Sequence, residues 1–267
     1  LLQYATQRWT SLQLKSHIET AQKLGDIVKE AFQFIETRLH KTDYSGIISS
    51  PPNEFETAEF IRRRFREEGL DSPDGPIVSV NSHCSDPHYE PSFETSSKIK
   101  NGDWILIDLW ARKSDVPNDV YADITWTAYV GNKVPDCKQK VFDIVISARD
   151  KALQYLKSSY MSGNPVQGCQ VDDVARNHIA KEGYSEYFTH RLGHSINDNV
   201  HGEAVNLDNF ETHDSRYIIP GIGFSIEPGI YLPEFGVRSE IDVYMSEEGP
   251  YATSPVQTEI ILIKPTT

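Results

Sequence analysis

Acidic residues interrupt stretches of this chain that otherwise have the composition of buried β-strands. Asp108 lies in the apolar run WILIDL, and Asp123 is flanked by β-favouring residues in VYADITWT. Glu227 ends the apolar segment GFSIE, and Glu240 lies in GVRSEIDVYM. A carboxylate on a buried strand is costly unless it is paired with a cation or binds a metal. Any fold of this chain must therefore accommodate these four carboxylates.

Each acid taken singly has an ordinary explanation. Asp108 could cap a turn, Glu227 could pair with a lysine, and Glu240 could face water beside Arg238, which shares its face of an alternating strand. Together the four would repel one another unless cations neutralised them. Two divalent ions supply four positive charges, which match the four carboxylates. The pattern therefore favours a metal site over four unrelated acids.

A second group of metal-binding residue types follows in the segment FTHRLGHSINDNVHG. His190 and His194 have the i, i+4 spacing that places two side chains on one face of a helix, as metal ligands often are. An HxxxH pair alone is weak evidence, and a single histidine is more often structural. With His201 the segment holds three histidines, and Gly193 and Gly202 allow close approach of the backbone to a ligand. This combination favours a ligand site.

Hydrophobic periodicity along the chain predicts an α+β fold. Apolar residues recur at helical spacing in the first two-thirds, whereas strand patterns dominate the end. We expect helices at residues 13–39, 54–69, 139–156 and 171–182, and strands at 76–81, 104–109, 120–130, 223–226, 236–245 and 257–263. This order favours a largely antiparallel sheet over a doubly wound parallel one. No linker divides the sequence, so one domain over residues 1–267 is expected.

Composition argues against several other classes of protein. The formal net charge is −13, whereas nucleic-acid binding needs lysine and arginine to neutralise phosphates. No stretch approaches the roughly 20 apolar residues of a membrane span. Cys84, Cys137 and Cys169 are odd in number and widely spaced, which fits neither a disulfide framework nor a zinc ribbon and favours the reducing cytoplasm. The chain begins at Leu1 rather than Met, as a fragment or a processed form does.

Several segments together resemble the creatinase/aminopeptidase P/methionine aminopeptidase family of metallopeptidases, whose fold is called the pita-bread fold. In chain order they are PHYEP (87–91), LID (106–108), YADITWT (121–127), HRLGHSINDNVHG (190–202), SIEPGIYLP (225–233) and GVRSEIDV (236–243). The resemblance covers nearly the whole chain and implies a curved, mostly antiparallel sheet covered by helices. It is closest to the Xaa-Pro aminopeptidase and prolidase branch, because Arg238-Ser239-Glu240 resembles the Arg-x-Glu strand of that branch.

The resemblance implies a set of five metal ligands, carried over residue by residue. They are Asp108, Asp123, His194, Glu227 and Glu240. In this family the second aspartate and the last glutamate bridge two divalent ions, so Asp123 and Glu240 would be the bridges here. Asp108 would complete the shell of one ion, and His194 and Glu227 that of the other. Such ligands suit manganese, cobalt, zinc or iron.

Other residues match positions that act beside the metals. The resemblance implies that His88 and His201 contact the substrate, and that Glu227 also relays a proton to the leaving amine. His190 would lie beside the site, and Arg238 would orient a ligand carboxylate. The implied function is hydrolysis of the first peptide bond of short peptides, with a preference for Xaa-Pro, through a hydroxide that bridges the two metals.

Two other functions stay open on the same fold. One is a non-catalytic module that binds peptides or proteins, and the other is a creatinase-like amidinohydrolase. A phosphatase finds no support, because the motifs lack a glycine-rich phosphate cradle. The peptidase interpretation implies a peptide substrate, no nucleic acid or membrane partner and a cytoplasmic location, and it allows a homodimer. Relatives often carry an N-terminal domain, to which nothing in this sequence is similar.

The chain departs from the family pattern between the first two aspartates, and a second glutamate competes with Glu240. The first two aspartates of the ligand set lie farther apart than usual, so residues 111–120 must form an extra loop, in which Asp115 and Asp119 are not expected to be ligands. Glu259, in VQTEIILI, is a rival to Glu240, because a Gln-x-Glu strand occurs in methionine aminopeptidases. We prefer Glu240, because the residues after it continue as the family's final hairpin does.

Overall fold

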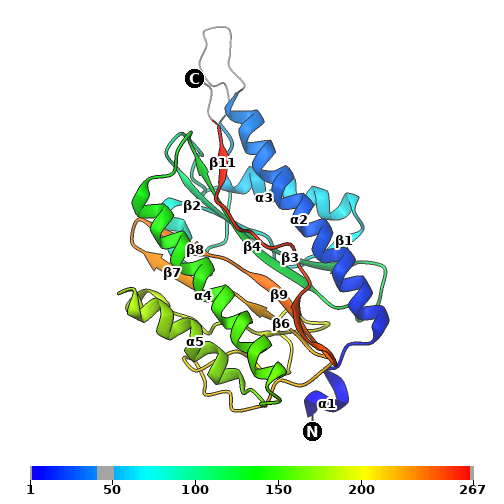
Figure 1. Ribbon diagram of the computed structural model, residues 1–267. Helices are drawn as coiled ribbons and strands as arrows, with labels where there is room; N and C mark the ends of the chain where they lie inside the picture. Colours follow the sequence, from blue (N-terminus) through cyan, green and yellow to red (C-terminus); the bar gives the residue numbers. More distant parts are fainter. Residues whose placement is uncertain (1, 41–50, 265–267) are drawn as a thin grey trace, which may run out of the picture.

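The computed structural model describes residues 2–40 and 51–264, and its strands lie between two groups of helices (Figure 1). The helices are α1 (Leu2–Thr6), α2 (Ser11–Leu39), α3 (Glu54–Glu67), α4 (Asp136–Met161) and α5 (Gly168–Lys181), with short 3₁₀ helices η1 (Asn81–Ser85) and η2 (Ser185–Tyr187). The strands are β1 (Leu70–Asp71), β2 (Ile77–Val80), β3 (Trp104–Lys113), β4 (Ala122–Val130), β5 (Ser195–Ile196), β6 (Gly223–Ile226), β7 (Gly229–Leu232), β8 (Phe235–Arg238), β9 (Ile241–Ser246), β10 (Gly249–Ala252) and β11 (Ile261–Ile263).

Two sheets and a hairpin make up the strand layer. In the first sheet β3 pairs with β4, β1 and β2 pair with the other edge of β3, and β11 adds to β4. The second sheet has the order β10-β9-β6-β5, and β7 forms a hairpin with β8. Among the described strands, every pairing is antiparallel except that of β11 with β4. The predicted α+β fold with a mostly antiparallel sheet is confirmed.

The alternation of side chains along β3 explains why its sequence is apolar throughout. Ile105 and Ile107 pack into a core formed with α2 and α3, whereas Trp104 and Leu106 pack into a core formed with α4 and α5. Both faces of the strand are therefore covered, as its continuous apolar run requires. Asp108 continues the Trp104 and Leu106 face.

On β4 the same alternation separates apolar from polar residues. Ala122, Ile124 and Trp126 pack with α2, so the opposite face presents Asp123 and Thr125. Both are buried, and Thr125 is fully inaccessible to solvent. A row of buried polar side chains thus runs along the inner face of β4, where the second sheet lies against it.

Capping residues fix where two of the expected helices begin. Thr10 and Gln13 form a capping box at the start of α2, which therefore begins two residues earlier than predicted. The Asn53 side chain accepts a hydrogen bond from the Glu56 amide at 2.7 Å, so α3 begins at the predicted residue. α3 ends at Glu67, shortly before the expected C-terminal residue Gly69, which adopts a left-handed φ of 68°.

The predicted strand 236–245 is interrupted. β8 ends at Arg238 and β9 begins at Ile241, so Ser239 and Glu240 lie between two strands. The amide of Glu240 donates to the carbonyl of Thr125 on β4 at 3.2 Å. The prediction of one continuous strand is wrong because this backbone passes from the hairpin to the second sheet and bonds to β4 between them.

The predicted strand 257–263 is shorter than expected, since only β11 forms. The side chain of Gln257 takes over the pairing with β4: its Oε1 accepts from the Thr127 amide at 2.9 Å, and its Nε2 donates to the Thr127 carbonyl at 2.7 Å. A side-chain amide therefore satisfies a backbone pair that a longer strand would otherwise have satisfied.

The expected extra loop is present between β3 and β4. β3 continues to Lys113, and the chain turns before β4 begins at Ala122. Asp115 is exposed on this turn, whereas Asp119 is buried and accepts a hydrogen bond from Ser16 Oγ of α2 at 2.6 Å. Within residues 2–40 and 51–264, no helix has the length and apolar character needed to cross a membrane.

Candidate metal centre

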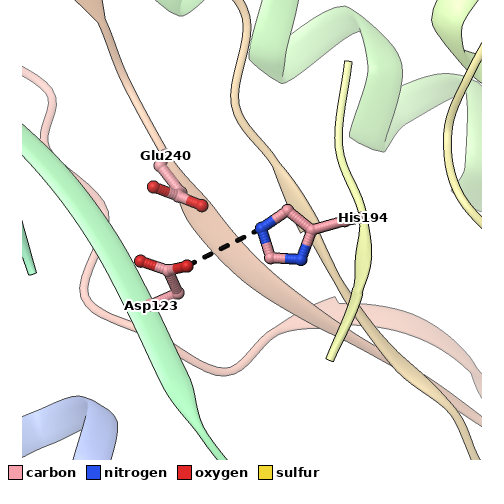
Figure 2. Close-up of side chains that lie close together, drawn as sticks. All are labelled: Asp123, His194 and Glu240. Carbon is pink, nitrogen blue, oxygen red and sulfur yellow. Dashed lines mark ion pairs between the residues drawn. The ribbon is translucent and has the colours of Figure 1, made fainter. Parts of the chain in front are cut away.

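Three of the expected metal ligands converge from distant parts of the sequence. Asp123 lies on β4, His194 directly precedes β5, and Glu240 lies between β8 and β9. Figure 2 shows their side chains pointing toward one another, with His194 Nε2 at 3.7 Å from Asp123 Oδ2. All three are buried, and one ligand atom from each lies within 4.8 Å of the other two. In the part of the chain that the structure describes, this is the one cluster of three such side chains.

The two remaining expected ligands lie beside this cluster. Glu227 follows β6 and places Oε1 at 3.3 Å from His194 Nε2. Asp108, on β3, lines the same cavity of about 350 Å³ as the other four. Asp108 and Asp123 belong to the first sheet, whereas His194, Glu227 and Glu240 adjoin strands of the second. The five side chains thus meet at the seam between the two sheets.

Burial changes the protonation of these ligands. Desolvation, reinforced by neighbouring carboxylates, raises the pKa of Asp123 and Glu240 well above the ordinary range. Desolvation also raises the pKa of Glu227 to about 7, although the positive charge of Arg238 opposes it. The pKa of His194 is lowered, again mainly by desolvation. Its ring is therefore neutral, and because Nδ1 faces the Ser195 carbonyl at 3.2 Å, the lone pair of Nε2 points toward the carboxylates.

The donor set fits a divalent metal ion. Three of the five expected ligands have a buried carboxylate oxygen without a hydrogen-bond partner among the described residues: Asp108 Oδ1, Asp123 Oδ1 and Glu240 Oε1. A buried oxygen without a partner is costly, and a cation would satisfy it. Carboxylate oxygens together with one imidazole are typical ligands of manganese, iron, cobalt and zinc.

Arg238 supplies a permanent positive charge to the cluster. Its Nη2 donates to Asp108 Oδ2 at 2.5 Å, and its Nε donates to Thr125 Oγ1 at 3.1 Å. The Thr125 hydroxyl in turn donates to Glu240 Oε2 at 2.7 Å. One guanidinium therefore contacts one expected ligand directly and a second through the Thr125 hydroxyl.

The prediction that His190 and His194 share a helix face is wrong. This segment is extended, and Gly193 forms a β-bridge with Leu207. The backbone lies so close to β6 that a Cβ atom on Gly193 would be 2.1 Å from the Ser225 carbonyl oxygen. Glycine at this position thus allows the approach, and the two histidines contact different partners.

The other three expected histidines lie at different depths. His201 packs edge-on against His194, with 4.4 Å between ring centroids, and lines the cavity. His88 is exposed and lines the cavity from the segment after η1. His190 contacts Tyr231 Oη through Nε2 at 2.7 Å, and desolvation lowers its pKa to about 3. His190 therefore lies beside the cluster as a neutral ring.

The rival acid Glu259 lies away from the cluster. It is exposed, whereas Glu240 is 2% exposed. Two residues that sequence reasoning missed do contact the site. Tyr231 Oη accepts a hydrogen bond from Arg238 Nη1 at 3.1 Å, and Asp242 Oδ2 accepts one from the amide of Asp123 at 2.9 Å. Asp242 follows Glu240 on the same face of the expected strand, and this position was the signal that could have identified it.

Comparison with known proteins identifies the class. The family model described as "Metallopeptidase family M24" matches residues 18–247, so the chain belongs to this family. Within it, an Xaa-Pro dipeptidase of Pyrococcus furiosus is 27% identical over 263 residues, which are 92% of this chain and 70% of that protein. An Xaa-Pro dipeptidase of Pyrococcus horikoshii is 27% identical over 94% of this chain and 70% of its own length. The chain thus falls in the Xaa-Pro branch of the family.

Solved structures agree with this placement. A prolidase from Thermococcus sibiricus has a TM-score of 0.76 at 28% identity, over 98% of this chain and 64% of that one. An Xaa-Pro dipeptidase from Bacillus anthracis has a TM-score of 0.80 at 25% identity, over 98% of this chain and 65% of that one. The predicted pita-bread fold is confirmed, and this chain spans about two thirds of the length of these structures.

Proposed function

We propose that this chain is a metal-dependent peptidase that hydrolyses the first peptide bond of short peptides, with a preference for Xaa-Pro. The observation that carries the proposal is the convergence of five ligand side chains on one cavity, three of them with unpartnered buried oxygens. The names of the relatives supply the substrate class. A binding module without metal would gain nothing from burying this many carboxylates together.

Two divalent ions, of manganese, cobalt, zinc or iron, are the proposed cofactors. Asp123 and Glu240 would hold both ions, Asp108 would complete one shell, and His194 and Glu227 the other. When bound, such ions lower the pKa of a coordinated water to about 7 and so supply a nucleophile at neutral pH. The protein's own part is to hold the ligands in place, which it does through Arg238 and Thr125.

The remaining cavity residues would handle the peptide. His201 and His88 line the cavity, where each can donate a hydrogen bond to the carbonyl oxygen as negative charge develops on it. Glu227 lies at the edge of the cluster and would pass a proton to the leaving amine. His190, held neutral, keeps Tyr231 against Arg238 and so supports the orientation of Asp108.

The proposal is tested with the purified chain loaded in turn with Mn²⁺, Co²⁺, Zn²⁺ and Fe²⁺. We expect release of the first residue from an Xaa-Pro dipeptide, slower release from the matching Xaa-Ala dipeptide, and no hydrolysis of creatine. Bound metal, measured by elemental analysis, should approach two ions per chain. A chain that binds metal but cleaves creatine alone would favour the amidinohydrolase, and one that binds peptide without metal or cleavage would favour the binding module.

A further inference from the structure

The carboxylate of Glu54 is a buried hub that the proposed chemistry does not use. Glu54 begins α3 and its side chain is fully inaccessible to solvent. It accepts hydrogen bonds from the Val80 and Ser97 amides, each at 2.7 Å, from Tyr89 Oη at 2.7 Å, and from His83 Nδ1 at 2.8 Å. All four donors belong to residues 80–97, which we call the arm.

The arm has little regular structure of its own. After β2 it forms the short helix η1 and then runs without helix or strand as far as Ser97. Near its start, Ser85 Oγ donates to the Leu232 carbonyl of β7, which ties η1 to the hairpin. Beyond that point no sheet ladder fixes the arm. Its backbone bonds are two turns and the bond from the Glu54 amide to the Ser97 carbonyl at 3.3 Å, so side-chain contacts supply much of the remaining restraint.

The arm forms one wall of the cavity that the expected ligands line. Pro87 and His88 line the cavity from this segment. His88 therefore belongs to the lining of the site, although its own side chain is exposed.

Tyr89 links this wall to Glu54. It follows His88 directly in the sequence, and its ring stacks on His83 with 4.3 Å between centroids and 24° between planes. Both stacked rings bond the same carboxylate. Glu54 thus restrains the residue next to His88 through two side chains and restrains the end of the arm through Ser97.

We propose that Glu54 is a positioning residue that fixes the arm so that His88 faces the cluster of Asp123, His194 and Glu240. The effect of Glu54 on catalysis rests on the proposed function. A carboxylate that accepts four hydrogen bonds and is itself inaccessible to solvent holds its donors strongly, since water cannot replace it as their partner. Displacing a group beside the reacting bond by about 1 Å can cost about a hundredfold in rate.

The test compares Glu54→Gln with the parent chain. Glutamine keeps the shape but replaces one acceptor oxygen with an NH₂ group, so one set of donors loses its partner. We expect faster amide hydrogen exchange across residues 80–97, unchanged metal content, and a fall in kcat of about tenfold or more with a smaller change in KM. In the His88→Ala background the same substitution should have little further effect on kcat.

Two other variants separate positioning from loss of stability. Tyr89→Phe removes one of the four donors and should give a smaller change in the same direction, even if Glu54→Gln folds poorly. Asp119→Asn alters another buried carboxylate, far from the arm in sequence and bonded to α2, and should leave exchange in the arm unchanged. Unchanged exchange in the arm, or full additivity of Glu54→Gln with His88→Ala, overturns the proposal. A parent chain that cleaves neither dipeptide overturns the proposed function instead, while the exchange rates still decide the role of Glu54.

Discussion

Arg238 and Asp108 form a buried ion pair in which Nη2 lies 2.5 Å from Oδ2. The ion pair thereby joins the β7–β8 hairpin to the first sheet, since Arg238 ends β8 and Asp108 lies on β3. The guanidinium is 3% exposed, so its charge is little screened by water. Its removal would leave neighbouring carboxylates buried without a cation.

We therefore expect Arg238→Met to destabilise the metal-free chain by about 3–5 kcal/mol. Urea unfolding followed by circular dichroism measures the loss. Arg238→Lys retains the charge but not the planar fork that reaches both Asp108 and Thr125, so its stability should lie between those of the parent and Arg238→Met. If Arg238→Met unfolds at the same urea concentration as the parent, the ion pair contributes nothing to the fold.

Metal binding should release protons and weaken as the pH falls below 7. The pKa values of Asp123, Glu240 and Glu227 are raised, so these carboxyls hold protons that a metal must displace. Calorimetric titration with Mn²⁺ in two buffers of different ionisation enthalpy measures the protons released. Equal observed enthalpies in both buffers would contradict the expectation, and Asp123→Asn is the control that should abolish tight binding.

Substitutions should distinguish the cluster from the acids outside it. Asp123→Asn and Glu240→Gln are expected to abolish peptide hydrolysis while the circular dichroism spectrum stays unchanged. Asp115→Asn and Glu259→Gln are exposed counterparts and should leave hydrolysis unaffected. Full activity in a folded Asp123→Asn variant would remove this residue from the ligand set.

His201→Ala should lower kcat by about a hundredfold through loss of a donor to the developing oxyanion. The metal content should stay that of the parent chain, because His201 lies beside His194 and outside the proposed ligand set. Elemental analysis of the purified variant tests this point. Loss of metal from His201→Ala would instead make this histidine a ligand.

His17 should make the fold sensitive to acid. Its ring is fully buried, its Nδ1 donates to the Tyr121 carbonyl at 2.7 Å, and desolvation lowers its pKa from 6.5 to about 4. As the pH falls, the unfolded chain therefore takes up this proton first. The contribution is fully present above pH 6.5 and is lost progressively down to about pH 4.

The expected loss from this residue is about 2 kcal/mol between pH 7 and pH 5. Urea unfolding at both pH values, in the parent and in His17→Gln, measures it. Asp242, whose Oδ2 lies 3.7 Å from His17 Nε2, is present in both chains, so its own titration largely cancels in the comparison. Identical pH dependence in the two chains would show that His17 has the same pKa in the folded and unfolded states.

The sequence allowed the site to be predicted because carboxylates on buried strands are chemically anomalous. Asp108 and Asp123 stood out against apolar neighbours, and both lie at the cavity. The histidine spacing was misleading, since an i, i+4 pair is equally compatible with an extended segment whose side chains have separate partners. Gly193 is required by the close approach of this backbone to the Ser225 carbonyl, but that contact is long-range and cannot be seen in the local sequence.

The fold was predictable where local sequence signals decide it. It was less predictable where a side chain takes the place of a backbone hydrogen-bond partner. α3 begins at the expected residue because Asn53 caps it. The end of the chain was predicted as a longer strand because nothing local shows that the Gln257 side chain pairs with Thr127. His17 gave no signal for the same reason: its partners lie more than a hundred residues away in sequence.

The division of the five proposed ligands between two sheets has a mechanical consequence. The first sheet packs on α2 and α3, and the second packs in the core with α4 and α5, to which the first sheet adds Trp104 and Leu106. The side chains of the five proposed ligands span the boundary between the two sheets. Ions bound there would hold the two sheets together, because the sheets could separate only if ligand atoms first left the metal. Metal binding and the stability of the fold would then be coupled, so removal of the metal would weaken the protein first at the boundary between the two sheets.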